Sequence, residues 1–438
     1  MAITDRYGLE VTTASPRAAE HFQEGMDRLL SYRPGAADSF AAAVEADDRL
    51  AVAHAGAAMV AAVVGDAAAA RAGVARARET AAGATRRERQ HVEAVSALLG
   101  GEAAHGLALV DEHVAEFPRD ALLVNLASSA IGFSGHRERE QQRVAFVERL
   151  APAYGDDWWC ASALAFTYME VNRFEECRRL SEASLAQYPG NANASHNLAH
   201  VYFETVDNDA GAKFLDAWLA TYDPRASFHC HLAWHLAMFE LHRGHAARAR
   251  EIFERDIQRA VNPRLAMIDG SALLWRLRLD GAPTPPAAWR ALADLAARVS
   301  RPGFVFGEIH AALAYAACGD DAGLERLIDG LRALEAKGHP VAGTVALPLV
   351  QGIAAFAAGE HAAALAFFES VEGEIHRVGG SHAQWELFEE TMIAGYFAVE
   401  RHADAARLIR RRLARRASPR DLRALERATA SLAHGGLT

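Results

Sequence analysis

The sequence predicts an all-α protein built from consecutive helical hairpins, and three observations support this. Hydrophobic residues make up 51% of the 438 residues, which is enough for a folded core. Alanine and leucine, both strong helix formers, dominate the composition, whereas β-branched runs are scarce. Short breaks that contain glycine recur between the helical stretches. We therefore expect about eleven or twelve helical hairpins of about 34–40 residues each.

The hairpins are recognised by small residues placed at a fixed distance from a glycine turn. Gly65, Gly244, Gly319 and Gly359 are each preceded, seven positions earlier, by alanine or glycine. This is the tetratricopeptide pattern, in which a small side chain lets the two helices of a hairpin cross closely. The next hairpin then covers the apolar face that remains. The pattern predicts a tetratricopeptide-like α-α superhelix that curves towards a nearly closed ring, with the first helix of each hairpin on the inner face.

Helix start signals place the elements along this array. The first helix is expected at Pro16, after the N-cap Ser15. Thr85 and Glu88 have the spacing of a capping box, and another helix is expected after Thr284-Pro285-Pro286. No break is long enough for a domain linker. We expect one continuous helical-repeat domain over residues 1–438. It has degenerate repeats in 15–150, the best-formed repeats in 155–260 and C-terminal repeats in 262–438.

Charge and cysteine usage narrow the classes of partner. The net charge of -10 gives no support for nucleic-acid binding, and the basic run Arg407 to Arg416 is expected to be a solvated helix face. The longest apolar run, Ala51 to Val64, is too short to cross a bilayer, and the N-terminus lacks the pattern of a signal peptide. The four cysteines form no CxxC pair. These features predict a soluble cytoplasmic protein with no membrane partner.

Two histidine pairs in the best-formed repeats are the strongest candidates for function. His196 and His200 form one pair, and His231 and His235 form the other. The i, i+4 spacing places both rings of a pair on one helical face. In the repeat frame both pairs fall on inner helices of neighbouring hairpins, which pack about 8–10 Å apart. We therefore expect the four imidazoles to converge on one patch of a concave groove.

Other residues are expected to join this patch. Glu204 extends the stripe of His200, Asp269 is expected in the first turn of an inner helix, and His382 follows the capping box of Ser381 and Gln384. A curved array brings His382 round towards the histidine pairs. The further ligand-binding candidates are His310, Trp158, Trp159 and Trp275, with the tryptophans as aromatic walls. His21, His91, His105 and His113 are assigned to the surface.

Three interpretations of the histidine patch remain open at this stage. It is a packing feature, or it binds a small molecule or short peptide segment, or it is a metal or acid–base site. In the last case His196, His200, His231 and His235 are the candidate ligands of a divalent metal such as zinc. His200, His235 and Glu204 are the candidate catalytic residues of a hydrolase or lyase. The helical H-E-x-x-H motif is absent, because Asn197 follows His196.

Several segments together resemble the tetratricopeptide repeat protein 38 family. They are His196-Asn-Leu-Ala-His200-Val-Tyr-Phe-Glu204, His231-Leu-Ala-Trp-His235 and Gly379-Gly-Ser-His-Ala-Gln384. Phe214-Leu-Asp-Ala-Trp218 and Leu273-Leu-Trp-Arg276 are also similar. The resemblance spans nearly the whole chain and implies a helical-repeat fold and a soluble intracellular protein. It implies no particular reaction, cofactor or partner, so the functional interpretation rests on the residues themselves.

Overall fold

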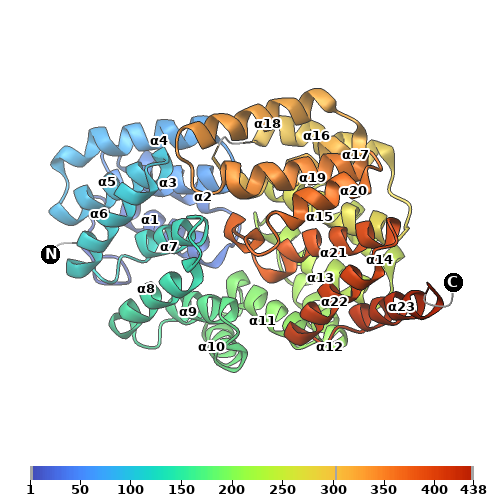
Figure 1. Ribbon diagram of the computed structural model, residues 1–438. Coiled ribbons are helices and arrows are strands. Elements are labelled where there is room, and N and C mark those ends of the chain that lie inside the picture. Colours follow the sequence, from blue (N-terminus) through green and yellow to red (C-terminus); the bar gives the residue numbers. More distant parts are fainter. Residues whose placement is uncertain (1–2, 301–302, 436–438) are drawn as a thin grey trace. The chain divides into compact units, whose positions relative to one another are not determined.

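The computed structural model describes residues 3–300 and 303–435, and within these ranges it contains 23 α-helices and no β-strand. A single isolated bridge pairs Thr4 with Glu10 near the start of the chain. Many helices are followed after a short turn by a helix that packs against them, as in α1 with α2, α3 with α4 and α9 with α10 (Figure 1). The predicted all-α, tetratricopeptide-like hairpin fold is confirmed.

The chain divides into two compact groups of residues, which we call unit 1 and unit 2. Unit 1 comprises Met1–Ser134, Glu138–Leu198 and Tyr222–His229, and unit 2 comprises Gly135–Arg137, Ala199–Thr221 and Cys230–Thr438. Two helices, α11 (Ala192–Glu204) and α13 (His229–His242), have residues in both groups. The organisation as one continuous domain over residues 1–438 stays a prediction.

The helices of unit 1 follow one another along the chain (Figure 1). They are α1 (Pro16–Ser31), α2 (Ala36–Ala46), α3 (Ala51–Val64), α4 (Ala67–Thr80), α5 (Arg86–Gly100), α6 (Ala103–Glu116), α7 (Ala121–Gly132), α8 (Arg139–Tyr154), α9 (Trp158–Glu170) and α10 (Phe174–Gln187). A short 3-10 turn, η1 (Ala81–Gly83), lies between α4 and α5.

Unit 2 holds the remaining helices. They are α12 (Asn208–Leu219), α14 (Ala246–Ile252), α15 (Pro263–Leu279), α16 (Pro286–Val299), α17 (Val305–Cys318), α18 (Asp321–Ala336), α19 (Leu347–Ala357), α20 (His361–Glu369), α21 (His382–Ala398), α22 (His402–Arg415) and α23 (Pro419–Gly435). Three shorter turns accompany them: η2 (Phe253–Ile257), η3 (Ala342–Ala346) and η4 (Ile375–Val378). Helices α15, α17, α19 and α21 pack in sequence, and α21 also packs on α15. Alternate helices therefore stack side by side, as the repeat pattern predicts.

The predicted turn and cap residues have the expected conformations. Gly65 and Gly319 end α3 and α17 in the left-handed conformation, with φ of 90° and 72°. Only glycine adopts this region without a steric penalty. The side chain of Ser15 caps α1, and Thr85 and Glu88 form a capping box at α5. Helix α16 starts at Pro286.

The prediction of a solvated face for Arg407 to Arg416 is right for Arg407, Arg410 and Arg411, which are exposed, and wrong for Arg412 and Arg416. Arg412 is only 2% exposed, and its guanidinium lies 3.1 Å from carboxylate oxygens of both Glu389 and Asp421. Arg416 is also buried and is paired with Glu386. The sequence pattern does not reveal this, because the partner carboxylates lie on α21 and α23. Arg412 therefore joins α22 to these two helices instead of facing water.

No helix among the described residues is long and apolar enough to cross a lipid bilayer.

Helices α12 and α13 approach each other closely at Gly211 in α12, so a larger residue there should destabilise the fold. A Cβ atom added there would lie 2.5 Å from the ring of Phe239, which is fully buried in α13. We expect Gly211→Ala to lower the free energy of unfolding by about 1–3 kcal/mol, because the ring has no room to move away. Denaturation in urea, followed by circular dichroism, measures the change.

The matched control is Gly330→Ala in α18, where an added Cβ meets no atom within 4 Å. This variant should gain about 0.5–1 kcal/mol, since alanine is the better helix former. Equal or greater stability of Gly211→Ala would contradict the close-packing account.

Candidate functional site

The two histidine pairs lie on α11 and α13, as the sequence predicts. His196 and His200 are one turn apart on α11, and His231 and His235 are one turn apart on α13. Both helices follow the hairpin pattern, so alanine and leucine fill the positions between the histidines and pack into the core. The apolar positions fix the rotation of each helix about its axis, and this rotation sets the direction in which the imidazoles point.

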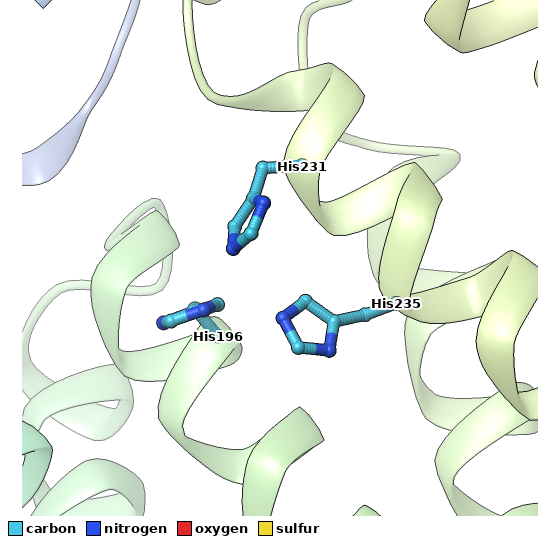
Figure 2. Close-up of side chains that lie close together, drawn as sticks. All are labelled: His196, His231 and His235. Atoms are coloured by element: carbon cyan, nitrogen blue, oxygen red, sulfur yellow. The ribbon is translucent and has the colours of Figure 1, made fainter. Parts of the chain in front are cut away.

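His231 and His235 place two imidazoles side by side on α13 in unit 2. Their rings lie edge-on to each other, and Figure 2 shows both side chains projecting from the same helix. Imidazole nitrogen is a common ligand of zinc and other first-row transition metals. His196 belongs to unit 1, where its ring packs on Phe166 and Phe228.

A buried carboxylate fixes the orientation of one of these rings. The Nδ1 atom of His231 lies 3.0 and 3.1 Å from the two carboxylate oxygens of Asp269 on α15. Nδ1–H donates to the carboxylate, so the lone pair of the ring is on Nε2. The ring of His231 also stacks on Trp234, with an interplanar angle of 7°. Both contacts restrict the ring to one position.

The position of Asp269 differs from the prediction. Helix α15 starts at Pro263, because the side chain of Asn262 caps it by accepting a hydrogen bond from Leu265 N–H. Asp269 therefore lies in the interior of the helix and not in its first turn. Its carboxylate is 1% exposed, and its partner is His231 on a different helix.

His200 packs against the same rings and stays uncharged. Its ring lies edge-on to that of His235, with centroids 4.4 Å apart, and His235 lies edge-on to His231 at 4.9 Å. Burial, together with the nearby His231 and His382, lowers the pKa of His200 to about 3. A neutral imidazole retains a lone pair that can accept a proton or bind a metal.

His382 and Glu204 meet at the edge of this cluster. Nδ1 of His382, at the start of α21, lies 3.5 Å from Oε1 of Glu204 on α11, so the predicted approach of His382 to the patch is confirmed. The other oxygen of Glu204 lies 3.9 Å from the guanidinium of Arg416. Sequence reasoning missed Arg416, and the only available signal was its place in the basic run. Glu204 thus places a buried carboxylate next to the imidazole of His382.

The four histidines do not form the wall of an open groove, which corrects the prediction of a concave histidine surface. All are buried, with exposed fractions of 5% for His196, 1% for His200, 6% for His231 and 1% for His235. Within unit 2 the rings of His200, His231 and His235 pack on one another, and His231 also stacks on Trp234. Within unit 1 the ring of His196 packs on Phe166 and Phe228. His382, with 20% of its side chain exposed, is the more accessible member.

The predicted aromatic walls are packing residues. Trp158 stacks on Tyr188, and Trp159 packs edge-on to Tyr7 in the core of unit 1. Trp275 is fully buried in unit 2, and its indole N–H donates to the hydroxyl of Thr391 at 3.0 Å. A buried tryptophan whose N–H is already paired offers no polar group to a ligand. These three tryptophans therefore pack in the core and do not form aromatic walls of a groove.

His310 packs among phenylalanines. Its Nδ1–H donates to the carbonyl of Phe306 at 2.8 Å, and its ring packs against those of Phe306 and Phe388. Burial lowers the pKa of His310 to about 4. The contacts are those of a core histidine, so the predicted ligand-binding role of His310 has no support from its surroundings.

Two histidines assigned to the surface are buried instead. His91 and His113 both contact the carboxylate of Asp120 in unit 1, at 3.0 and 3.1 Å. The guanidinium of Arg87 approaches the same carboxylate at 3.0 Å. Although burial alone would raise it, these cationic and hydrogen-bonding partners hold the pKa of Asp120 well below its usual range. The assignment holds for His105, which is exposed, while His21 is half-buried.

A cavity of about 620 Å³ lies in unit 1, and none of the predicted site residues lines it. Its lining includes Pro16, Glu24, Asp27, Arg28 and Tyr188. Both acidic and basic side chains line it, and no sequence pattern singled it out. It offers no alternative location for the histidine chemistry.

No family model matches the chain. The solved structures it resembles are helical-repeat proteins at 12% identity. A human IFIT1 dimer with m7Gppp-AAAA aligns over 99% of this chain and 97% of that chain, with a TM-score of 0.44. An IFIT1 monomeric mutant with Gppp-AAAA covers 98% and 94%, with a TM-score of 0.42. The APC/C Cut9-Hcn1 hetero-tetramer covers 86% and 76%, with a TM-score of 0.38. At this level the likeness gives no argument about a ligand.

The lowered pKa of His310 predicts that part of the protein's folding stability is lost at acid pH. The unfolded chain binds a proton at this residue near pH 6.5, whereas the folded chain binds it only near pH 4. The contribution of His310 to the free energy of unfolding is therefore fully present above about pH 6.5, and it is lost as the pH falls towards 4. We expect the stability of His310→Gln to fall less steeply over this window than that of the wild type.

Urea denaturation of both proteins at pH 8, 6, 5 and 4.5 tests this. The difference in unfolding free energy between wild type and variant should narrow from pH 6 to pH 4.5. A difference that stays constant over this window would show that His310 does not titrate as its burial implies.

Proposed function

We propose that this chain is a tetratricopeptide-like helical-repeat protein that binds a small ligand at the histidine cluster. The observation that carries the proposal is the convergence of ionisable side chains from four helices in unit 2. They are His200 and Glu204 on α11, His231 and His235 on α13, Asp269 on α15 and His382 on α21. Stacking of helical hairpins requires only apolar contacts, so the fold itself does not demand these residues.

Three of these imidazoles lie against one another in the interior of unit 2. His200, His231 and His235 are all buried, and the ring of His235 contacts the other two. Apolar side chains of equal volume would fill the same space without burying ring nitrogens. A ligand that uses ring nitrogens would account for this grouping.

The burial favours a small ligand over an extended peptide segment. A peptide needs a continuous exposed groove, whereas the rings of His200 and His235 are each 1% exposed. Only His382, at the edge of the cluster, is appreciably accessible. We therefore favour a small ligand held among the rings over a partner chain lying along the surface.

A second candidate function is acid–base catalysis at the same site. The contact between His382 and Glu204 favours it, since a carboxylate that orients an imidazole is the usual arrangement for proton transfer. In a hydrolase- or lyase-type reaction, His382 would exchange protons with solvent and Glu204 would hold its ring. Hydrolysis of p-nitrophenyl acetate and phosphate by wild type, His382→Ala and Glu204→Gln tests this. Equal rates in all three would remove the candidate.

Features of the sequence also support a proposed family and a proposed cellular location for the chain. Resemblance in the His196–Glu204 and His231–His235 segments supports membership of the tetratricopeptide repeat protein 38 family. Unpaired cysteines and a net charge of -10 support a reducing cytoplasm and a ligand other than nucleic acid.

Native mass spectrometry of the full chain, purified without chelator, tests the binding proposal. We expect the wild type to carry a non-covalent ligand that is lost on denaturation, and His235→Ala to be recovered without it. His235 is chosen because its ring contacts both His200 and His231.

The control is His310→Gln, which changes a buried histidine of unit 2 outside the cluster and should keep the ligand. Indistinguishable masses for wild type and His235→Ala, with both proteins folded, would contradict the proposal.

A further inference from the structure

We infer that the cavity of about 620 Å³ in unit 1 binds a small zwitterion with a net positive charge, of the class of the basic amino acids. The inference goes beyond the proposed function, because it concerns a different site and does not use the histidine cluster. All the residues that line the cavity belong to unit 1. Its volume lies within the range of about 300–1,000 Å³ that is usual for small-molecule sites.

Helix α1 supplies one wall of the cavity because it is amphipathic. Phe22, Met26 and Leu29 bury one face of this helix in the core of unit 1. Another face carries carboxylates and lines the cavity from Glu20 to Asp27. These two residues are two helical turns apart, so their backbone positions lie about 10 Å apart along the axis. A wall of this kind can receive two positive groups of one ligand.

One carboxylate of this wall is already paired and another is not. Glu24 accepts hydrogen bonds from the guanidinium of Arg28 at 2.6 Å and from the hydroxyl of Ser39 at 3.2 Å. Glu20 is exposed and has no hydrogen-bond or ion-pair partner among the described residues. The carboxylate of Glu20 is therefore available to a cationic group of a ligand.

Asp27 offers a second carboxylate, which is partly withdrawn from water. Its cationic partner is Arg6, whose guanidinium lies 3.3 Å away and is also paired with Asp157. One guanidinium thus serves two carboxylates. Burial raises the pKa of Asp27, while Arg6 acts in the opposite direction. An ion pair between Asp27 and a ligand is stronger than one at a fully solvated surface, because water screens it less.

Arg33 supplies a positive charge for the carboxylate of the ligand. Its Nη1 donates to the hydroxyl of Tyr188 at 2.9 Å, and it forms no ion pair with a carboxylate of the described residues. The ring of Tyr188 is held in turn by stacking on Trp158, with centroids 4.4 Å apart and an interplanar angle of 16°. Tyr188 therefore positions a guanidinium whose remaining N–H groups can bind a carboxylate.

The balance of charges selects the class of ligand. The lining and the ion pairs beneath it hold four carboxylates and three guanidinium groups, from Glu20, Glu24, Asp27, Asp157, Arg6, Arg28 and Arg33. One negative charge is in excess, so a ligand with a net charge of about +1 complements the site. A ligand with amines alone would leave Arg33 without a partner, and a dicarboxylate would be repelled by Glu20 and Asp27. A basic amino acid supplies both cationic groups and the carboxylate.

Isothermal titration calorimetry of the full chain with L-lysine and L-arginine tests the inference. We expect one equivalent of either amino acid to bind. Cadaverine, which is lysine without its carboxylate, should bind about tenfold more weakly or worse, because it forms no hydrogen bond with Arg33. L-glutamate, which lacks the second cationic group, should not bind.

Three conservative substitutions in the cavity extend the test. Glu20→Gln and Asp27→Asn should each weaken the binding of L-lysine by about tenfold, since each removes a partner of a cationic group. Arg33→Gln should weaken the binding of L-lysine by a similar factor and leave the weak binding of cadaverine unchanged. None of these side chains is fully buried, so the variants should fold, and circular dichroism checks this.

Two further variants are controls. Glu112→Gln removes an exposed carboxylate of α6 that does not line the cavity, and it should bind L-lysine with wild-type affinity. Tyr188→Phe keeps the ring and removes only the hydroxyl that positions Arg33. It should weaken the binding of L-lysine by less than Arg33→Gln does.

The contradicting results are specific. If the wild type binds neither amino acid, the inference is wrong. Binding that is unchanged in Glu20→Gln, Asp27→Asn and Arg33→Gln would place the amino acid elsewhere and also overturn it. Cadaverine that binds as tightly as L-lysine would overturn the zwitterionic class of ligand. None of these outcomes affects the ligand of the histidine cluster, which native mass spectrometry tests separately.

Discussion

The whole structure depends on each helical hairpin being covered by its neighbour. A hairpin of two helices cannot bury its own apolar face, so the next one along the chain must pack on it. Small residues make this possible where helices approach closely, as Gly73 does against Ala58 and Gly211 does against Phe239. Close packing also fixes the rotation of each helix, and this rotation decides which side chains meet. The histidines of α11 and α13 are brought together by the same constraint that builds the core.

Three buried polar clusters then differ in how their charges are balanced. Asp120 in unit 1 is surrounded by Arg87, His91 and His113, and Arg412 in unit 2 is surrounded by carboxylates that include Glu386 and Glu389. In both, every charge faces an opposite charge, which is the requirement for a stable buried ion pair. The histidine cluster is different, because its imidazoles lie edge-on to one another while Asp269 holds His231 and Glu204 lies beside His382. The proposed ligand binding rests on this grouping of imidazoles.

Local sequence signals predicted the fold and part of the site. Glycine turns, caps and the spacing of small residues are local, so Gly65, Ser15 and Thr85 were placed correctly. The i, i+4 pairs were likewise found on the faces expected of them. Burial was not predictable, because it depends on partners far away in sequence. His91 and Arg412 looked solvated only because Asp120 and Glu389 are distant from them along the chain. The prediction of an open groove was wrong for the same reason, because the side chains that bury the imidazoles come from other helices.

The central claim is that a small ligand contacts the buried imidazoles of His200, His231 and His235 in unit 2. A crystal structure of the full chain, purified without chelator, tests this most directly. We expect electron density for a non-protein group in contact with a ring nitrogen of at least one of these three residues. Density in which all three rings contact only protein atoms would contradict the claim.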